Sequence, residues 1–179
     1  VWLLLAAVVV GATFGQPFGR GRCLMQGCCH GREAAPWLGI RYTHPRSRVV
    51  RLSDLGGVSV HATPVYSMIW TLAVGSMLLW LWRLAAPLSL IVGAYFVLIG
   101  LGRFVEEHYR GEPQTATLAG LRLYQWLALA FVVGGAAATT IATEAAPTPV
   151  GREENVLPAI MVVAFVSYLA FGVDFPRAG

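Results

Sequence analysis

The chain has 179 residues, of which 56% are hydrophobic and only 12% are charged, about half the charged share of an ordinary soluble domain. All 13 basic residues are Arg, and with nine acidic residues the net charge is +4. This composition excludes an intrinsically disordered chain, which needs low hydrophobicity and high charge. It also argues against a soluble enzyme, and it predicts an all-α, polytopic integral membrane helical bundle.

The apolar residues form long continuous blocks rather than alternating, which excludes a closed transmembrane barrel. A helix needs about 20 mostly apolar residues to cross about 30 Å of hydrocarbon. By this measure the sequence predicts about five transmembrane segments, the first of them partial: 1–18, 64–82, 87–105, 121–142 and 158–175. A buried soluble helical bundle is the rival interpretation, but blocks of this length with so little charge are not typical of one.

The first block has no initiating Met, no basic region and no small-residue cleavage site, so it does not resemble a signal peptide. We expect it to be the remainder of a longer helix in an N-terminally cut fragment. The expected organisation is a partial transmembrane helix (1–18), an Arg-, Gly- and Cys-rich motif loop (19–63), a three-helix transmembrane core (64–142) with a motif turn at 103–122, and a loop with an additional transmembrane helix (143–179). A loop as long as the second segment usually has a function.

The Arg residues also bear on membrane orientation. Ten of them fall on one side of the expected bundle, and Arg83 and Arg152 fall on the other. The positive-inside rule would place the ten in the cytoplasm. That rule assumes solvated Arg side chains, and it does not apply to Arg residues that line a site for an anion.

The first motif runs GRGRCLMQGCCHGR from Gly19 to Arg32. Its glycines, including Gly27 and Gly31, allow the backbone to approach a ligand or a helix closely. Arg20 and Arg32 supply planar guanidinium groups suited to phosphate. A basic membrane-flanking loop with helix-packing glycines accounts for the same residues equally well.

The motif also contains three thiols and an imidazole that suggest a metal site: Cys23, Cys28, Cys29 and His30. Structural zinc requires four ligands, usually in separated pairs. Adjacent Cys28 and Cys29 cannot easily face one ion, and the sequence holds no second Cys/His pair with zinc spacing. We therefore expect no metal, no cofactor and no disulfide framework, and interpret the thiols as small soft residues near a membrane-embedded turn.

Arg103, Glu107 and Arg110 are spaced i, i+4 and i+7, which places them on one stripe of a helix. Arg103 lies about 24 Å along that helix from Pro87, where an ionised group should face the protein interior or a wet cavity. Such a stripe can hold one guanidinium by pairing and leave the other for an anion. The alternative is a self-paired face at the membrane interface.

A third group, His61 and Tyr66, stands where the block 64–82 begins. Thr63 followed by Pro64 is a favourable helix start. A rigid helix start is also a good mount for a functional histidine.

These motifs together resemble the prolipoprotein diacylglyceryl transferases, a family of bacterial inner-membrane enzymes. The family patterns are G-R-I-G-N-F-I-N-G-E-x-x-G-R, H-P-[ST]-Q-L-Y-E, R-F-x-x-E-x-x-R and G-L-S-M-G-Q-W-L, and segments 19–32, 61–67, 103–110 and 120–127 resemble them in that order. The resemblance implies transfer of a diacylglyceryl group from phosphatidylglycerol to the lipobox cysteine thiol of a prolipoprotein, with release of glycerol-1-phosphate. The implied partners are phosphatidylglycerol, the signal-peptide and lipobox segment of the precursor, and membrane lipid, with no nucleic acid.

Carried over by motif, Arg20 and Arg103 would bind the phosphate and stabilise the leaving group, while Glu107 would orient Arg103. The further substrate-binding positions are Gly19, Gly27, Gly31, Arg32, Tyr66 and Arg110. The incoming thiol must lose a proton. His61 is our candidate for the base, and His30 is the second.

The sequence departs from the family patterns at several positions. The Asn and Glu of the first motif are Cys23 and Cys28, and the family's upstream histidine-glycine motif would lie before Val1. A non-catalytic lipid-binding or scaffold relative therefore stays open as an alternative, and a transporter is a distant third because paired broken spans are missing. The family resemblance also reverses the orientation, because it implies that the loop 19–63 faces the periplasm.

Overall fold

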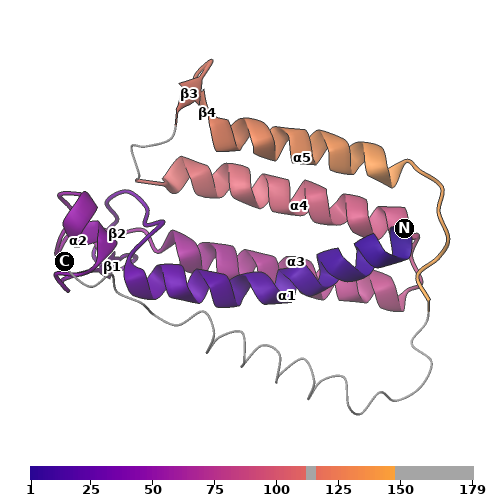
Figure 1. The fold of residues 1–179 in the computed structure, drawn as a ribbon, viewed down its shortest axis with the longest axis horizontal. Helices are drawn as coiled ribbons and strands as arrows, with labels where there is room; N and C mark the ends of the chain where they lie inside the picture. Colours follow the sequence, from indigo (N-terminus) through magenta and orange to yellow (C-terminus); the bar gives the residue numbers. More distant parts are fainter. Residues whose placement is uncertain (112–115, 148–179) are drawn as a thin grey trace, which may run out of the picture.

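The computed structural model describes residues 1–111 and 116–147. Figure 1 shows the long helices lying side by side along one direction. The elements, in chain order, are α1 (Trp2–Gln26), β1 (Ile40–Arg41), α2 (Arg48–Leu52), β2 (Ser59–Val60), α3 (Thr63–Arg83), α4 (Leu88–Tyr109), β3 (Thr117–Leu118), β4 (Leu121–Arg122) and α5 (Leu123–Thr139). The strands form two short antiparallel pairs, in which Ile40 is opposite Val60 and Leu118 is opposite Leu121. The expected helix 158–175 lies outside the described residues.

Three helices, α1, α3 and α4, are long and apolar enough to cross a membrane. Their surfaces remain largely uncovered by protein, since only 28–33% of each apolar stretch is buried, and a helix that is apolar all round in this way suits lipid. Helix α5 is equally apolar but has 17 residues, about 25 Å of helix, and is shorter than the expected 121–142. The prediction of an all-α membrane bundle is confirmed for the described part of the chain.

Helix α1 differs from the expectation, because it continues past residue 18 to Gln26. The apolar block ends at residue 18, but the helix accommodates Pro17 and ends only at Gly27, whose left-handed backbone has φ 68°. There the Cys28 amide donates to the Cys23 carbonyl at 3.1 Å, as in a glycine-terminated helix. Arg20 and Cys23 consequently stand on the last turns of a helix and not in a loop.

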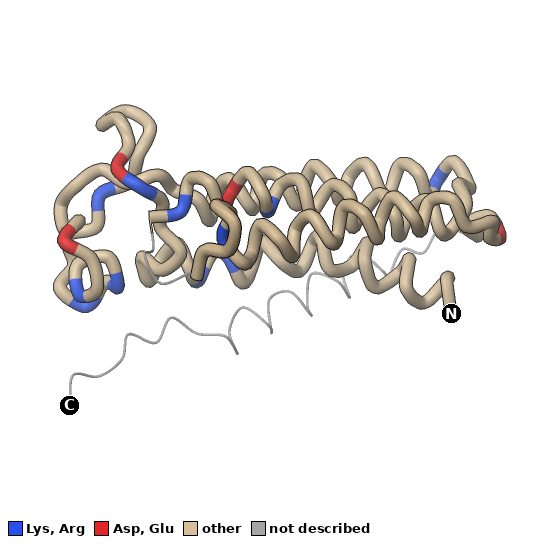
Figure 2. Tube along the Cα trace, turned by 90° about the horizontal axis from the view of Figure 1, so that it is seen from above, with Lys and Arg blue, Asp and Glu red and all other residues tan. Residues whose placement is uncertain are grey.

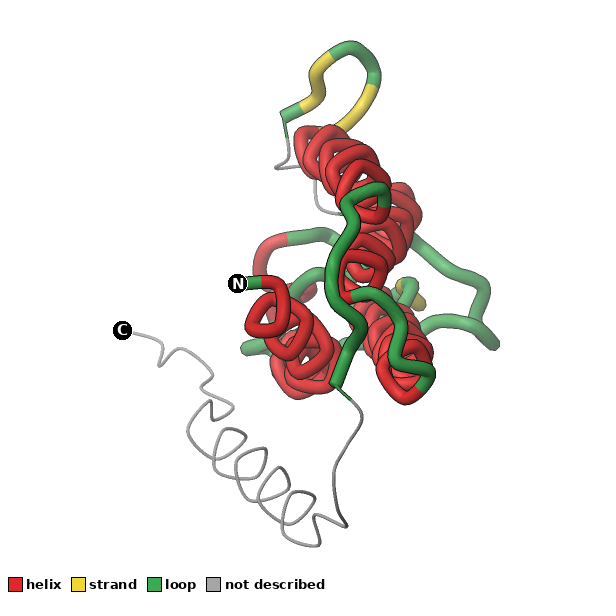
Figure 3. Tube along the Cα trace, turned by 90° about the vertical axis from the view of Figure 1, so that its right-hand side faces the viewer, coloured by secondary structure: helices red, strands yellow, loops and turns green. Residues whose placement is uncertain are grey.

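Small residues set the packing between α4 and α5. A Cβ added to Gly93 would lie 2.6 Å from the Gly135 carbonyl oxygen, and one added to Gly135 would lie 2.7 Å from the Gly93 oxygen. The two backbones are therefore in direct contact, as is common for membrane helices with small residues at the interface. Figure 3 shows α5 on the side of α4 away from α1 and α3.

The ends of four long helices meet at one end of the bundle. The C-terminal ends of α1 and α4 and the N-terminal ends of α3 and α5 lie there, beside α2 and the β1–β2 pair (Figure 1). Figure 2 shows most of the basic residues gathered at this end, while Arg83 is at the other. The described part of the chain thus keeps the charge asymmetry that the sequence predicts.

Candidate active site

A cavity of about 370 Å³ lies between α1, α3 and α4 near the charged end of the bundle, within the size range of small-molecule sites. Its lining residues are Gln16, Arg20, Tyr66, Ser67, Trp70, Thr71, Ile99, Leu101, Gly102, Arg103, Val105, Glu106 and Tyr109. Part of the cavity wall is apolar, and the wall also includes the guanidinium groups of Arg20 and Arg103. The cavity therefore suits a ligand that has both an apolar part and an anionic group.

Glu106 joins the three helices around the cavity. Its Oε1 atom is 3.1 Å from Nη1 of Arg103, and its Oε2 atom is 3.6 Å from Nη2 of Arg20 on α1. The Ser67 hydroxyl on α3 donates to the same Oε2 atom at 2.5 Å. Glu106 is only 8% exposed, so it contacts Arg20 and Arg103 from the protein interior.

Glu107 is fully buried and lies among three further guanidinium contacts. Its Oε2 atom is 3.7 Å from Arg103 and 3.6 Å from Arg110, and its Oε1 atom is 3.5 Å from Arg122 at the start of α5. The expected stripe of Arg103, Glu107 and Arg110 is therefore present, although Arg110 is the first residue after α4. Arg103 also stacks over the Tyr124 ring, 5.3 Å from its centroid.

The charges in this network do not balance. Four guanidinium groups, of Arg20, Arg103, Arg110 and Arg122, face the carboxylates of Glu106 and Glu107. Within these ion pairs of the described residues, guanidinium groups outnumber carboxylates by two. Arg20 and Arg103 line the cavity, and each side chain keeps 24% exposure. Guanidinium groups held in this way can bind a phosphate through paired hydrogen bonds.

His61 contacts two tyrosines that line the cavity. Its Nδ1 atom is 3.0 Å from the Tyr66 hydroxyl oxygen, and its ring lies 5.2 Å from that of Tyr109, measured between centroids. Both tyrosines line the cavity, whereas His61 is not among its lining residues. His30, the second candidate base, is buried with Nδ1 2.9 Å from the Gly31 carbonyl oxygen. Of the two histidines, His61 is the one with a contact that leads into the cavity.

The glycines of the first motif have different surroundings. A Cβ on Gly31 would lie 2.4 Å from Cβ of His61, and one on Gly27 would lie 2.6 Å from Oγ of Ser47. A Cβ on Gly19 would have no neighbour within 4 Å. Gly27 and Gly31 are thus required by packing, and Gly19 is not.

Arg32 lies outside the cavity and connects the loop to the end of α4. Its backbone amide donates to the Tyr109 carbonyl at 2.8 Å, and its guanidinium donates to the carbonyl of His108. The Gly31 amide donates in turn to the His61 carbonyl at 2.8 Å. The segment Gly31–Arg32 therefore holds His61 against α4 by backbone hydrogen bonds.

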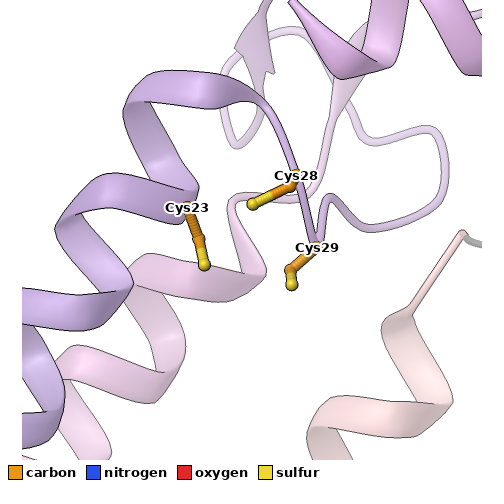
Figure 4. Close-up of side chains that lie close together, drawn as sticks. All are labelled: Cys23, Cys28 and Cys29. Carbon is orange, nitrogen blue, oxygen red and sulfur yellow. The ribbon is translucent and has the colours of Figure 1, made fainter. Parts of the chain in front are cut away.

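The thiols of Cys23, Cys28 and Cys29 converge at the end of α1 (Figure 4). All three Sγ atoms lie within 4.8 Å of one another, so the expectation that adjacent Cys28 and Cys29 cannot easily face one ion was wrong. Cys29 has a left-handed backbone with φ 57°, uncommon outside glycine, and this conformation turns two successive side chains toward the same space.

Hydrogen bonds with Cys23 and Cys28, followed by the positive charges of Arg110 and Arg20, hold the pKa of Cys29 below its usual range. Hydrogen bonds with its two neighbours and burial raise the pKa of Cys28.

Sequence reasoning missed Glu106, Ser67 and Arg122. Two adjacent carboxylates near the end of an apolar span were a usable signal, because ionised groups there are costly unless they are paired. The spacing of Arg103 and Glu106, at i and i+3, was another. Ser67 and Arg122 had no local signal, since their carboxylate partners belong to other helices.

The amino-acid sequence matches a known protein family. Residues 1–141 match the family described as prolipoprotein diacylglyceryl transferase. The chain belongs to this family. It is 30% identical over 128 residues to phosphatidylglycerol–prolipoprotein diacylglyceryl transferase 2 of Clostridium perfringens, which covers 72% of this chain and 47% of the relative. The enzyme of the same name from Clostridium tetani is 27% identical over 132 residues, covering 74% of this chain and 50% of the relative.

A third relative, the phosphatidylglycerol–prolipoprotein diacylglyceryl transferase of Dehalococcoides mccartyi, is 31% identical over 128 residues, covering 67% of this chain and 46% of that protein. The chain thus spans about half the length of the curated relatives that it matches. No solved structure matches the chain significantly.

Proposed function

We propose that the chain carries out diacylglyceryl transfer from phosphatidylglycerol to the lipobox cysteine thiol of a prolipoprotein. The observation that supports this most is the surplus of guanidinium groups beside a cavity with a partly apolar wall. The donor lipid has the matching character, with a phosphodiester next to two acyl chains. The names of the relatives supply the same donor and acceptor.

In the proposed step, the acceptor sulfur forms a bond to the glyceryl carbon of the lipid as that carbon's bond to the phosphate oxygen breaks. The thiol proton leaves to a base, and the bonding electrons depart with glycerol-1-phosphate. Negative charge grows on the phosphate during this step. Arg20 and Arg103, both lining the cavity, would stabilise that charge, since preorganised donors contribute most where charge develops.

The neighbouring residues have supporting roles in the proposal. Glu106 and Glu107 hold Arg103 between them, so its guanidinium is oriented before the lipid binds. The Tyr66 hydroxyl, in contact with His61, offers a path by which the thiol proton reaches the imidazole. The end of α4 and the loop 19–63 would be held in position around the site by Arg110, Gly31 and Arg32. Gly27 would set the residue at which α1 ends. Gly19 would leave room for lipid beside Arg20.

We further infer a multi-pass protein of the bacterial inner membrane, with the loop 19–63 on the periplasmic side. Helices long enough to span the membrane support the first part. The anion-binding character of the arginines at this end explains why they would not follow the positive-inside rule.

The test is phosphatidylglycerol-dependent lipidation of a prolipoprotein by membranes that contain the chain. Arg103→Lys keeps the charge but replaces a planar fork by a point charge, and we expect a fall in rate of about 100-fold or more. Arg83→Lys, at the opposite end of the bundle, is the matched control and should keep full rate. Full activity of Arg103→Lys, or no lipidation by the unaltered chain, would contradict the proposal.

One observation favours a second candidate, a non-catalytic lipid-binding or scaffold relative. Cys23 and Cys28 stand at the family positions of Asn and Glu, so part of the usual polar site differs. Expression in a bacterial strain depleted of its transferase separates the two. Rescue of growth supports the enzyme, and phosphatidylglycerol binding without rescue supports the second candidate.

A further inference from the structure

The thiol cluster of Cys23, Cys28 and Cys29 has no part in the proposed transfer reaction. It brings together every cysteine of the chain. Two come from the loop that follows α1, and one comes from the last turns of α1 itself (Figure 4). Helix packing alone does not require three thiols, which are soft metal ligands, to lie at one point.

We propose that Cys23, Cys28 and Cys29 form a three-coordinate thiolate site for Cu(I). Their Sγ atoms lie within 4.8 Å of one another. An ion about 2.3 Å from each of three thiolates in a plane holds them about 4.0 Å apart. The sulfurs therefore need to approach by less than about 1 Å to coordinate one ion.

The number of ligands decides between the thiophilic metals. Among the His, Cys, Asp and Glu side chains of residues 1–111 and 116–147, those gathered closely enough for one ion are these three thiols. Zinc sites are four-coordinate, with four protein ligands in structural sites or three and a water in open ones, whereas Cu(I) is selected by soft thiolate ligands and needs no fourth ligand. A set of three sulfurs without a described nitrogen or oxygen ligand fits Cu(I) better than zinc.

Burial and charge also suit such a site. Cys28 is 8% exposed, while Cys23 and Cys29 are partly exposed, so the site has a protected side and an entry path. A tris-thiolate Cu(I) centre carries a charge of −2. Arg20 lies on the same last turns of α1 as Cys23, so a positive side chain belongs to the same end of the helix.

The test uses the full chain, purified in detergent with reduced thiols and loaded anaerobically with Cu(I) against a chromophoric Cu(I) chelator. We expect binding of about one Cu(I) per chain, with sulfur-only coordination in the X-ray absorption spectrum. Loss of an outer-shell partner already costs 10–100-fold in metal affinity, so Cys28→Ser should lower the affinity by about 100-fold or more. Met25→Leu removes a neighbouring sulfur that is 62% exposed, and it should bind Cu(I) like the unaltered chain.

Alkylation of the unaltered protein supplies a measurement that needs no variant. Bound Cu(I) should protect all three thiols from a maleimide, and removal of the metal by the chelator should restore their reaction. The site is refuted if Cys28→Ser binds Cu(I) as tightly as Met25→Leu, or if copper leaves the thiols reactive. Tetrahedral zinc bound in preference to Cu(I) would refute the three-coordinate assignment. None of these readouts depends on transferase activity, so the metal site and the proposed reaction can fail separately.

Discussion

Replacing Glu107 by Gln tests whether the buried carboxylate holds the charged network together. The side chain is fully buried and lies 3.5–3.7 Å from three guanidinium groups. The amide has nearly the same shape, but it removes the negative charge that pairs with Arg110 and Arg122. Breaking a buried ion pair by removing one partner costs about 3–5 kcal/mol.

The expected consequence is a lower midpoint of thermal unfolding in detergent. For a chain of this size, 1 kcal/mol corresponds to about 2–4 °C, so even the lower cost predicts a fall of about 6–12 °C. The matched control is Glu33→Gln, the same chemical change at an exposed position. That variant should stay within about 0.5 kcal/mol of the unaltered protein.

The comparison of the two variants gives a clear refutation. If Glu107→Gln unfolds within about 2 °C of Glu33→Gln, then Glu107 does not neutralise its arginine neighbours in the folded protein. The comparison of guanidinium and carboxylate groups that supports the proposed phosphate site would then be wrong, because it counts Glu107 as the partner of these arginines.

Four further predictions concern α1, the loop and the cavity. Gly31→Ala places a Cβ 2.4 Å from Cβ of His61, and the overlap should destabilise the protein by about 1–3 kcal/mol; denaturant midpoints in detergent would measure it. Gly19→Ala meets open space within a helix and should stabilise it by about 0.5–1 kcal/mol; an accompanying loss of lipidation would support a lipid contact there, and unchanged lipidation would not. Tyr66→Phe removes the contact to His61 and should lower the lipidation rate without lowering the unfolding midpoint; an unchanged rate removes the tyrosine from the proton path. Trp37→Cys, 84% exposed, should react with an impermeant maleimide from outside intact cells when the three native cysteines are Ser, and labelling only after lysis contradicts the periplasmic loop.

The sequence determined the helical membrane class and the starts of two central helices. Long apolar blocks specify helices because the hydrocarbon leaves no other way to satisfy the backbone. Thr63 and Pro87 mark the starts of α3 and α4 because proline interrupts the preceding chain and favours the first turn. The Arg103–Glu107 pair was also accessible, since it depends only on the repeat of a single helix.

The tertiary structure decided which other groups meet these residues. Ser67 and Glu106 are 39 positions apart, and Arg20 reaches the same carboxylate from another helix. No periodicity within one helix encodes such a contact, because it depends on how α1, α3 and α4 are rotated against one another. The cysteine cluster shows the same limit on a smaller scale. The left-handed backbone at Cys29 brings adjacent side chains together, and a backbone angle held by its surroundings cannot be derived from spacing alone.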